Sequence, residues 1–219
     1  MVRIRTVAGG LAGLVAAAGA WTLYRRSTTD TVPYTTVAAV DDVELRRYPT
    51  AVAVETVAPS RSDAFRRLFR YISGANEGDA EIAMTAPVEV ADPEAATTGE
   101  RAAHGGRTIP MTTPVEAAES EAGVRMAFFL PDEYDYESAP RPTDESVDLV
   151  AVPERTLAVH RFRWRPTDDR IDRETERLTA TLERAGVATV GDPFYMGYDG
   201  PGALPAVRRN EVAVVVDAD

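Results

Sequence analysis

The chain has 219 residues, of which 35 are acidic and 24 are basic, and every basic residue is arginine. Four arginines precede the first acidic residue, so the rest of the chain sets 20 arginines against 35 acidic residues. Such a surface repels nucleic acid phosphates, which argues against a DNA or RNA partner, and the absence of cysteine excludes disulfides and thiolate metal sites. The acidic excess predicts an extreme halophile as the source; an acidic protein from a GC-rich genome is the alternative.

The first predicted element is an apolar segment, residues 6–24, which carries no charge and has two arginines on each side. About 18 to 20 apolar residues cross a bilayer as a helix, and Trp21 and Tyr24 would lie at the membrane interface. The segment predicts a single-helix membrane anchor. A cleaved export signal, cut after Ala20, and a soluble helix are the alternatives. We assign residues 1–33 to this segment and a polar linker, and residues 34–219 to one folded domain.

An internal repeat organises that domain. Residues 43–49 and 147–153 share the pattern Val-acid-Leu-x-x-x-Pro at an offset of 104 residues, and an apolar run and then a helix follow each copy. Periodic self-similarity of this kind indicates duplication. We interpret the chain as two strand–helix–strand–strand units, with halves of about 40–131 and 144–217.

Two amphipathic helices are predicted. The first, at 62–73, has an apolar stripe at helical spacing, with Ser60 or Ser62 as the cap and Gly74 as the stop. The second, at 169–185, ends at Gly186. Each exposes an apolar face that must pack on a sheet.

Short strands rich in β-branched and aromatic residues are predicted at 52–57, 125–130, 156–162 and 211–216. Residues 91–107 lack apolar periodicity and predict a surface loop. That loop separates two copies of Met-Thr-x-Pro-Val, within 82–88 and 109–115, which suggests an extended hairpin flap.

Several motifs stand in a fixed order. The first half holds Arg-Arg-Tyr-Pro at 46–49, Tyr-Ile-Ser-Gly-Ala-Asn at 71–76, the two Met-Thr-x-Pro-Val pieces and Met-Ala-Phe-Phe-Leu-Pro at 126–131. The second half holds Pro-x-Pro-Thr-Asp at 140–144, Gly-Tyr-Asp at 197–199 and Arg-Arg-Asn-Glu-Val at 208–212. Together they resemble the SOUL haem-binding family, as a haloarchaeal-type member. The resemblance implies an α+β fold: a distorted antiparallel β-barrel with two helices packed outside, and a hydrophobic cleft for a tetrapyrrole. It extends more weakly to effector-binding domains of the same duplicated type, which hold other apolar molecules.

A haem slot needs apolar walls and cations near the propionates. The first helix offers both, and the Tyr-Met-Gly-Tyr segment near residue 196 is the candidate opposite wall. The predicted binding residues are Phe65, Arg66, Phe69, Arg70, Ile72, Tyr195, Met196 and Tyr198. An apolar stripe on a helix also suits plain core packing, which is the alternative for these side chains.

Iron ligation is where the sequence departs from the family. Some members are proposed to ligate iron through a histidine just before the tyrosine of the Arg-x-Tyr motif, and Arg47 occupies that position here. Arginine cannot coordinate iron. His104 falls in the predicted loop and His160 in a predicted strand. We therefore expect weak haem binding, or binding without a defined axial ligand, and no other metal site.

The sequence thus predicts a binding protein for haem or another tetrapyrrole at the membrane, in storage, transfer or buffering. A module for another apolar small molecule, or a hydrolase acting on such a ligand, are the alternatives. No phosphate-cradling glycine loop or Gly-x-Ser-x-Gly elbow is present. Glu211 is the candidate acid or base; its alternative role is an ion pair with Arg208 or Arg209.

Overall fold

The computed structural model describes residues 31–92, 100–101, 123–200 and 202–217. They form one antiparallel sheet of ten strands in the order β1-β2-β8-β10-β9-β4-β6-β3-β7-β5, and two helices pack against it. The strands are β1 Thr35–Val40, β2 Val43–Tyr48, β3 Ala51–Ala58, β4 Val88–Ala91, β5 Glu100–Arg101, β6 Val124–Phe129, β7 Val147–Val152, β8 Arg155–Phe162, β9 Thr189–Gly197 and β10 Asn210–Val216. The helices are α2 Arg61–Ile72, α3 Asp168–Ala185 and the short η1 Pro205–Val207.

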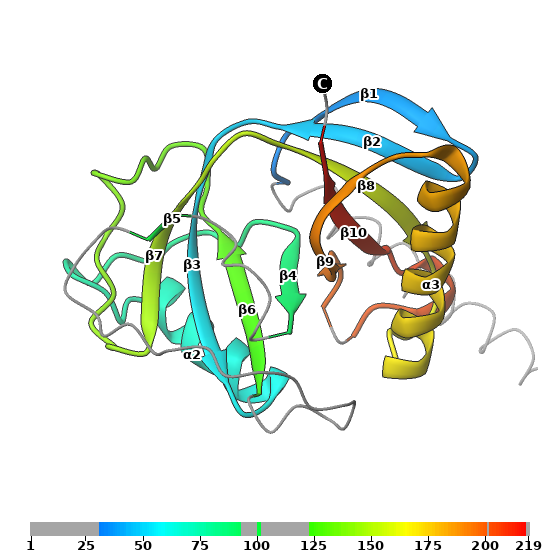
Figure 1. Cartoon of the computed structure of the whole chain (residues 1–219). Coiled ribbons are helices and arrows are strands. Elements are labelled where there is room, and N and C mark those ends of the chain that lie inside the picture. The colour runs from blue at the N-terminus through cyan, green and yellow to red at the C-terminus, as the bar shows by residue number, and fades with distance from the viewer. Residues whose placement is uncertain (1–30, 93–99, 102–122, 201, 218–219) are drawn as a thin grey trace, which may run out of the picture.

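The predicted α+β class is confirmed, with one correction to the barrel. The sheet curls strongly, so that α2 lies below the β3–β6 part and α3 beside β8 and β10 (Figure 1). Within the described residues β1 and β5 are the two ends of the strand order and do not pair with each other. The sheet is therefore strongly curled but open, because a closed barrel would require the edge strands β1 and β5 to pair with each other.

The strand register shows the predicted duplication. Val43 pairs with His160, and Val147 pairs with Thr56, which are the same two positions shifted by 104 residues. Each half thus lends its first strand to the other half, β2 beside β8 and β7 beside β3. The two halves also meet where β4 pairs with β9.

The helices form where the apolar stripes predict them, within one residue at each end. The hydroxyl of Ser60 accepts a hydrogen bond from the Asp63 amide at 3.1 Å and donates one to its carboxylate at 2.7 Å, so Ser60 is the cap of α2. Gly186 ends α3 with φ of 69°, a left-handed conformation that glycine adopts without strain.

Buried side chains form three clusters, because most central strands are apolar on both faces. One cluster packs under α2 and contains Phe128, and one packs under α3 and contains Val212. The third contains Phe129 and Met196 and fills the inside of the curl between the two halves. Successive residues of a central strand therefore pack into different clusters, on opposite faces of the sheet.

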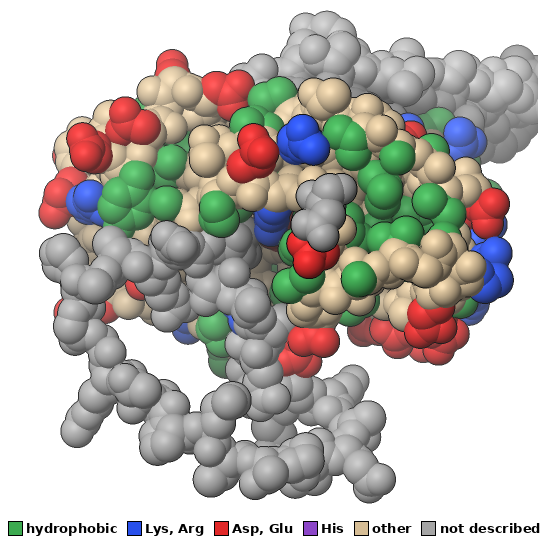
Figure 2. Space-filling view, turned by 45° about the horizontal axis from the view of Figure 1, so that its top comes forward, with side chains coloured by type: hydrophobic (Ala, Val, Ile, Leu, Met, Phe, Trp, Pro, Cys, Tyr) green, Lys and Arg blue, Asp and Glu red, His purple; other side chains and the backbone are tan. Residues whose placement is uncertain are grey.

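β1 and β9 were not anticipated, since β1 is exposed along most of its length and β9 contains Gly191 and Pro193. Figure 2 shows hydrophobic side chains on the side where β1 lies, with acidic clusters toward the margins. The predicted loop is not loop throughout, because Glu100–Arg101 pairs with β7. The second flap piece, His104 and the apolar segment 6–24 lie outside the described residues. Among the described residues, no helix is long and apolar enough to cross a membrane.

Candidate functional site

The solvent side of α2 carries a pair of exposed aromatic rings. Phe65 is 38% exposed and Phe69 is 48% exposed, which is unusual for phenylalanine. Their rings stack at 5.8 Å with an interplanar angle of 14°, and Phe65 also meets the ring of Phe128 edge-on at 5.3 Å. This side of α2 therefore presents a flat apolar surface next to the sheet.

From this exposed pair, aromatic rings continue below the surface along the sheet toward α3, because Phe128 and Phe162 are buried in the core. Val88 in β4 pairs with Phe128, and Val90 pairs with Tyr195 in β9. Tyr195 lies 6.3 Å from Phe162, and burial raises its pKa to about 12. We call the set Phe65, Phe69, Phe128, Tyr195 and Phe162 the aromatic strip. An ion pair of 2.8 Å between Arg61 and Asp168 joins the N-terminal ends of the two helices.

Arginines border the strip on α2, but each already has an acidic partner. Arg66 pairs with Asp63 at 2.7 Å, and Arg70 pairs with Asp144 at 3.2 Å. These guanidinium groups are mostly exposed, so each ion pair is weak and exchangeable.

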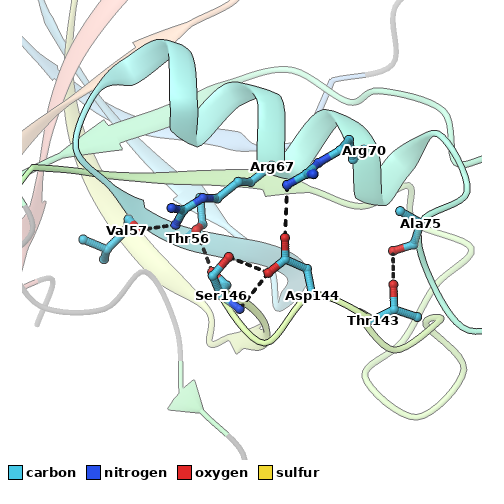
Figure 3. Close-up of polar contacts among 8 residues, drawn as sticks. All are labelled: Thr56, Val57, Arg67, Arg70, Ala75, Thr143, Asp144 and Ser146. Carbon is cyan, nitrogen blue, oxygen red and sulfur yellow. Dashed lines mark hydrogen bonds and ion pairs between the residues drawn. The ribbon is translucent and has the colours of Figure 1, made fainter.

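A surface groove of about 320 Å³ runs along the other side of α2. Figure 3 shows the polar contacts between α2 and the loop around Asp144 that borders this groove. Its lining residues are Arg67, Arg70, Tyr71, Ala75, Pro142, Thr143, Asp144 and Val147. Hydrogen bonds from the hydroxyl and amide of Ser146 hold the pKa of Asp144 below its usual range, with Arg70 as a further cause. The carboxylate therefore stays charged at neutral pH, and Arg70 lies between the groove and the aromatic strip.

The Pro-x-Pro-Thr-Asp motif fastens this loop to α2. The Tyr71 hydroxyl donates to the Pro140 carbonyl at 2.7 Å, and the Thr143 hydroxyl donates to the Ala75 carbonyl at 3.0 Å. Buried Asn76 donates to the carbonyls of Tyr71 and Ala80 and closes the turn after the helix. These hydrogen bonds hold the groove in shape, and Tyr71 and Thr143 also line it.

The structure brings some of the predicted residues together and separates others. Phe65, Phe69 and Tyr195 share the aromatic strip, with Arg66 and Arg70 beside it. Ile72 is 6% exposed and packs in the core under α2. Met196 and Tyr198 face the inside of the curled sheet, because they alternate with Tyr195 and Gly197 along β9.

The Arg-Arg-Asn-Glu-Val motif organises the interior. Glu211 is fully buried, and its two oxygens meet Arg46 and Arg209 at 2.8 Å each. Burial alone would lower the pKa of both guanidinium groups. Glu211 raises the pKa of Arg46, and Tyr198 and Glu211 raise that of Arg209, so both pKa values are raised overall. Arg209 also lies 3.7 Å from the ring centroid of Tyr198. Arg208 instead donates to backbone carbonyls of the loop before it.

The sequence predicted Arg208 or Arg209 as the partner of Glu211; the structure shows Arg209, together with Arg46, which was not predicted. The signal was present, because Arg46 follows Leu45 in a strand-like run and a charge at an inward position of such a run demands a buried partner. What the sequence does not tell is that β2 and β10 both flank β8.

His160 lies on the α3 side of β8. Its side chain is 5% exposed, with Nε2 at 3.0 Å from the Glu174 carboxylate and Nδ1 at 3.5 Å from that of Asp42. The imidazole therefore ties α3 to the β1–β2 turn.

A family model described as SOUL heme-binding protein matches residues 29–215, which covers both halves of the repeat. The chain belongs to the SOUL heme-binding protein family. This SOUL chain is similar to two solved structures. One is the crystal structure of the EcmrR C-terminal domain, with 14% identity, a TM-score of 0.53, and coverage of 85% of this chain and 99% of that chain. The other is a cryo-EM structure of an EcmrR–DNA complex, with 13% identity, a TM-score of 0.54, and coverage of 98% and 71%. At these identities the likeness shows the fold alone, and a comparison with curated proteins finds no match.

The described residues of the SOUL chain fit the ring and propionates of a tetrapyrrole better than its iron. Stacked phenylalanines suit the ring, and arginines suit carboxylates. No histidine belongs to the aromatic strip or the groove, and Arg47 stands where a ligating histidine is proposed in relatives. Met84, which is 37% exposed, is the one described methionine with substantial access to solvent.

Proposed function

We propose that this chain binds a tetrapyrrole on the aromatic strip, with Phe65 and Phe69 under the ring and Arg66 and Arg70 beside the propionates. The observation that carries the proposal is the exposed, stacked phenylalanine pair beside two arginines of the same helix, in a chain of the SOUL family. Burying apolar surface on both partners supplies about 25 cal/mol per Å², and each arginine adds a charge-assisted contact.

We expect this binding to be weak. The exposed part of the strip, Phe65 and Phe69, is a surface rather than an enclosed slot, so one face of the ring stays in water. Arg66 and Arg70 must also exchange Asp63 and Asp144 for the propionates. Association costs of at least about 4 kcal/mol then consume much of the gain from burial.

The iron contributes little to this binding, so we expect haem and metal-free protoporphyrin to bind equally well. When bound, haem would supply its own redox chemistry. No histidine of the described residues belongs to the aromatic strip on which it would lie. We further propose storage, transfer or buffering of the tetrapyrrole at a membrane, with residues 6–24 as the anchor and export as the alternative. Support for the anchor comes from the apolar segment alone, and the acidic excess supports the absence of a nucleic acid partner.

The test is a titration of the full chain with haemin and with protoporphyrin, followed by absorbance at the Soret band. We expect one saturable site for each ligand, weakened on the order of tenfold by Phe69→Ala and by Arg70→Ala. Arg47→Ala is the matched control, because Arg47 is exposed on β2 and away from α2. Equal binding by all variants, or no saturable binding by the wild type, would overturn the proposal.

A second candidate is a binding module for another flat apolar molecule. The same exposed phenylalanine pair favours it, since stacking does not require a porphyrin. In that case apolar compounds would raise the melting temperature while haemin and protoporphyrin would not.

A further inference from the structure

The helix α2 is the basic element of an acidic chain. It contains four arginines and a single acidic residue, Asp63, whereas the whole chain has 35 acidic residues against 24 basic ones. Arg61, Arg66 and Arg70 each have a carboxylate partner within 3.2 Å. Arg67 differs from them, because it forms no ion pair with any residue that the structure describes. Within that part of the chain, one cation of α2 is therefore left without an acidic partner.

Arg67 is nevertheless held in place. It is half-buried, and one terminal nitrogen of its guanidinium donates to the carbonyl of Val57, near the end of β3, at 2.9 Å. A guanidinium carries several N–H donors in one plane, so a single carbonyl leaves most of them unused. An anchored side chain also loses less conformational freedom on binding than a mobile one. Arg67 is therefore better prepared to bind an anion than a fully exposed arginine.

Arg67 and Arg70 belong to the same groove, the one beside α2. They are three residues apart in the helix, so their side chains leave it on the same face. Figure 3 shows both guanidinium groups on the side of α2 that faces the loop with Asp144. Both arginines lower the pKa of Asp144, and Arg70 is the one that pairs with it. The charged residues of the lining are these two arginines and one carboxylate, which gives a net charge of +1.

The groove has a charged end and an uncharged end. Figure 3 shows Arg67 at one end and Thr143 with Ala75 at the other. The uncharged lining residues are Tyr71, Ala75, Pro142, Thr143 and Val147. The wall opposite α2 is fixed, because the Thr56 hydroxyl donates to the Ser146 carbonyl at 2.6 Å. The volume of about 320 Å³ lies at the lower end of the range of about 300–1,000 Å³ that is typical of ligand pockets.

We propose that this groove is a second ligand site, which takes a small organic monocarboxylate between Arg67 and Arg70, with its apolar part toward Ala75. A carboxylate accepts parallel hydrogen bonds from arginine, and one negative charge balances the lining. A phosphate monoester carries about 1.5 to 2 negative charges at neutral pH, and its excess charge would face Asp144. Since exposed charge contacts are weak, we expect a Kd on the order of 1 mM. The site does not rest on tetrapyrrole binding, because Arg67 has no part in the aromatic strip.

The experiment follows NMR signals of the full chain in lipid nanodiscs, with ¹³C in the methyl groups of alanine and valine. The probes are benzoate, uncharged benzamide and phenyl phosphate, at constant ionic strength. We expect benzoate to shift the Ala75 and Val147 signals saturably. Benzamide should bind more weakly on the order of tenfold, as the loss of a charge-assisted contact predicts, and phenyl phosphate several-fold more weakly. Exposed Val190, which is not part of the groove, reports non-specific binding.

Two variants test the role of charge in the groove. Arg67→Gln keeps a donor for the Val57 carbonyl but removes the charge, so benzoate binding should weaken on the order of tenfold while protoporphyrin binding stays unchanged. Asp144→Asn raises the net charge of the lining to +2, so phenyl phosphate should then bind at least as tightly as benzoate. Arg47→Gln, which is exposed on β2 and outside the groove, is the control and should change neither.

Three results would count against the site. Equal binding of benzoate and benzamide by the wild type, or benzoate binding that is unchanged in Arg67→Gln, would overturn it. Phenyl phosphate binding more tightly than benzoate to the wild type would overturn the assignment to monocarboxylates. If benzoate bound as expected and protoporphyrin did not bind, the groove site would be supported and the tetrapyrrole proposal alone would fail.

Discussion

Charged side chains inside the curl are paired across the two halves of the chain. Glu211 in β10 holds Arg46 from β2, and Arg155 in β8 holds Glu89 from β4. Such pairs add little net stability over an apolar core, but losing one partner leaves a buried charge that costs about 3–5 kcal/mol. The main effect of these pairs is therefore to disfavour other arrangements of the strands, in which one partner would be buried without the other.

Glu211→Ala is expected to lower the free energy of unfolding by about 3–5 kcal/mol, because Arg46 and Arg209 lose their shared counter-charge. Arg47 is the neighbour of Arg46 in β2 but is exposed, so Arg47→Ala should change the free energy of unfolding by no more than about 0.5 kcal/mol. Denaturant unfolding measures both. If the two variants were equally stable, the buried network would have no structural role.

Several tyrosines make stability depend on alkaline pH. Burial raises the pKa of Tyr195 to about 12 and also raises the pKa values of Tyr48, Tyr71 and Tyr198. Between the unfolded value of about 10 and these folded values, the native state binds more protons than the unfolded state. Stability is therefore fully present below pH 10 and falls as the pH rises toward 12.

Tyr195→Phe should make this alkaline loss shallower, since one of the shifted phenols is gone. It should also destabilise the protein at neutral pH by about 1 kcal/mol, because Tyr195 donates to Asn210 at 2.8 Å. Denaturant unfolding from pH 8 to 11.5 checks both effects. A wild-type stability that did not fall above pH 10 would contradict the burial of these hydroxyls.

At the scale of single elements, the two serines near the start of α2 make a matched pair. Ser60 caps the helix through the Asp63 amide, and Ser62 is exposed on its first turn. Ser60→Ala should cost about 1 kcal/mol of stability and Ser62→Ala very little. Equal losses in thermal unfolding would place the cap elsewhere.

The loop that carries Asp144 limits access to Arg70. Asp144→Asn removes the charge that competes with a propionate, so we expect tetrapyrrole affinity to rise several-fold. Because the folded pKa of Asp144 is depressed, its contribution to stability is present above the unfolded pKa of about 4 and is lost as the pH falls through the lower folded value. The variant should therefore lose stability at neutral pH and depend less on pH in acid. Haemin titration and acid unfolding measure the two effects, and unchanged affinity would show that Arg70 does not bind the ligand.

At the scale of the whole molecule, local patterns predicted the parts that depend on sequence neighbours. Helical spacing placed α2 and α3, and the offset of 104 residues predicted a duplication, which the register of β2 with β8 and of β7 with β3 repeats. β9 escaped notice because Gly191 and Pro193 interrupt a strand that tertiary pairing nevertheless sustains. Whether the sheet closes into a barrel depends on whether its edge strands, β1 and β5, pair with each other, and no local sequence pattern predicts that pairing.

The candidate site was predictable in part for the same reason. Phe65, Phe69, Arg66 and Arg70 follow from one helix and its spacing. That Tyr195 joins them while Met196 does not depends on which face of β9 meets the α2 side. The partners of the two arginines differ in the same way. Asp63 lies one helical turn from Arg66 and follows from local spacing, whereas Asp144 is far from Arg70 in the sequence and depends on the tertiary fold.

The most direct test of tetrapyrrole binding on α2 is hydrogen–deuterium exchange of the full chain with and without protoporphyrin. We expect protection confined to peptides that cover α2, the loop at 140–146 and β9. Protection of α3 and β1 with α2 unchanged would contradict the placement of the ligand on the aromatic strip.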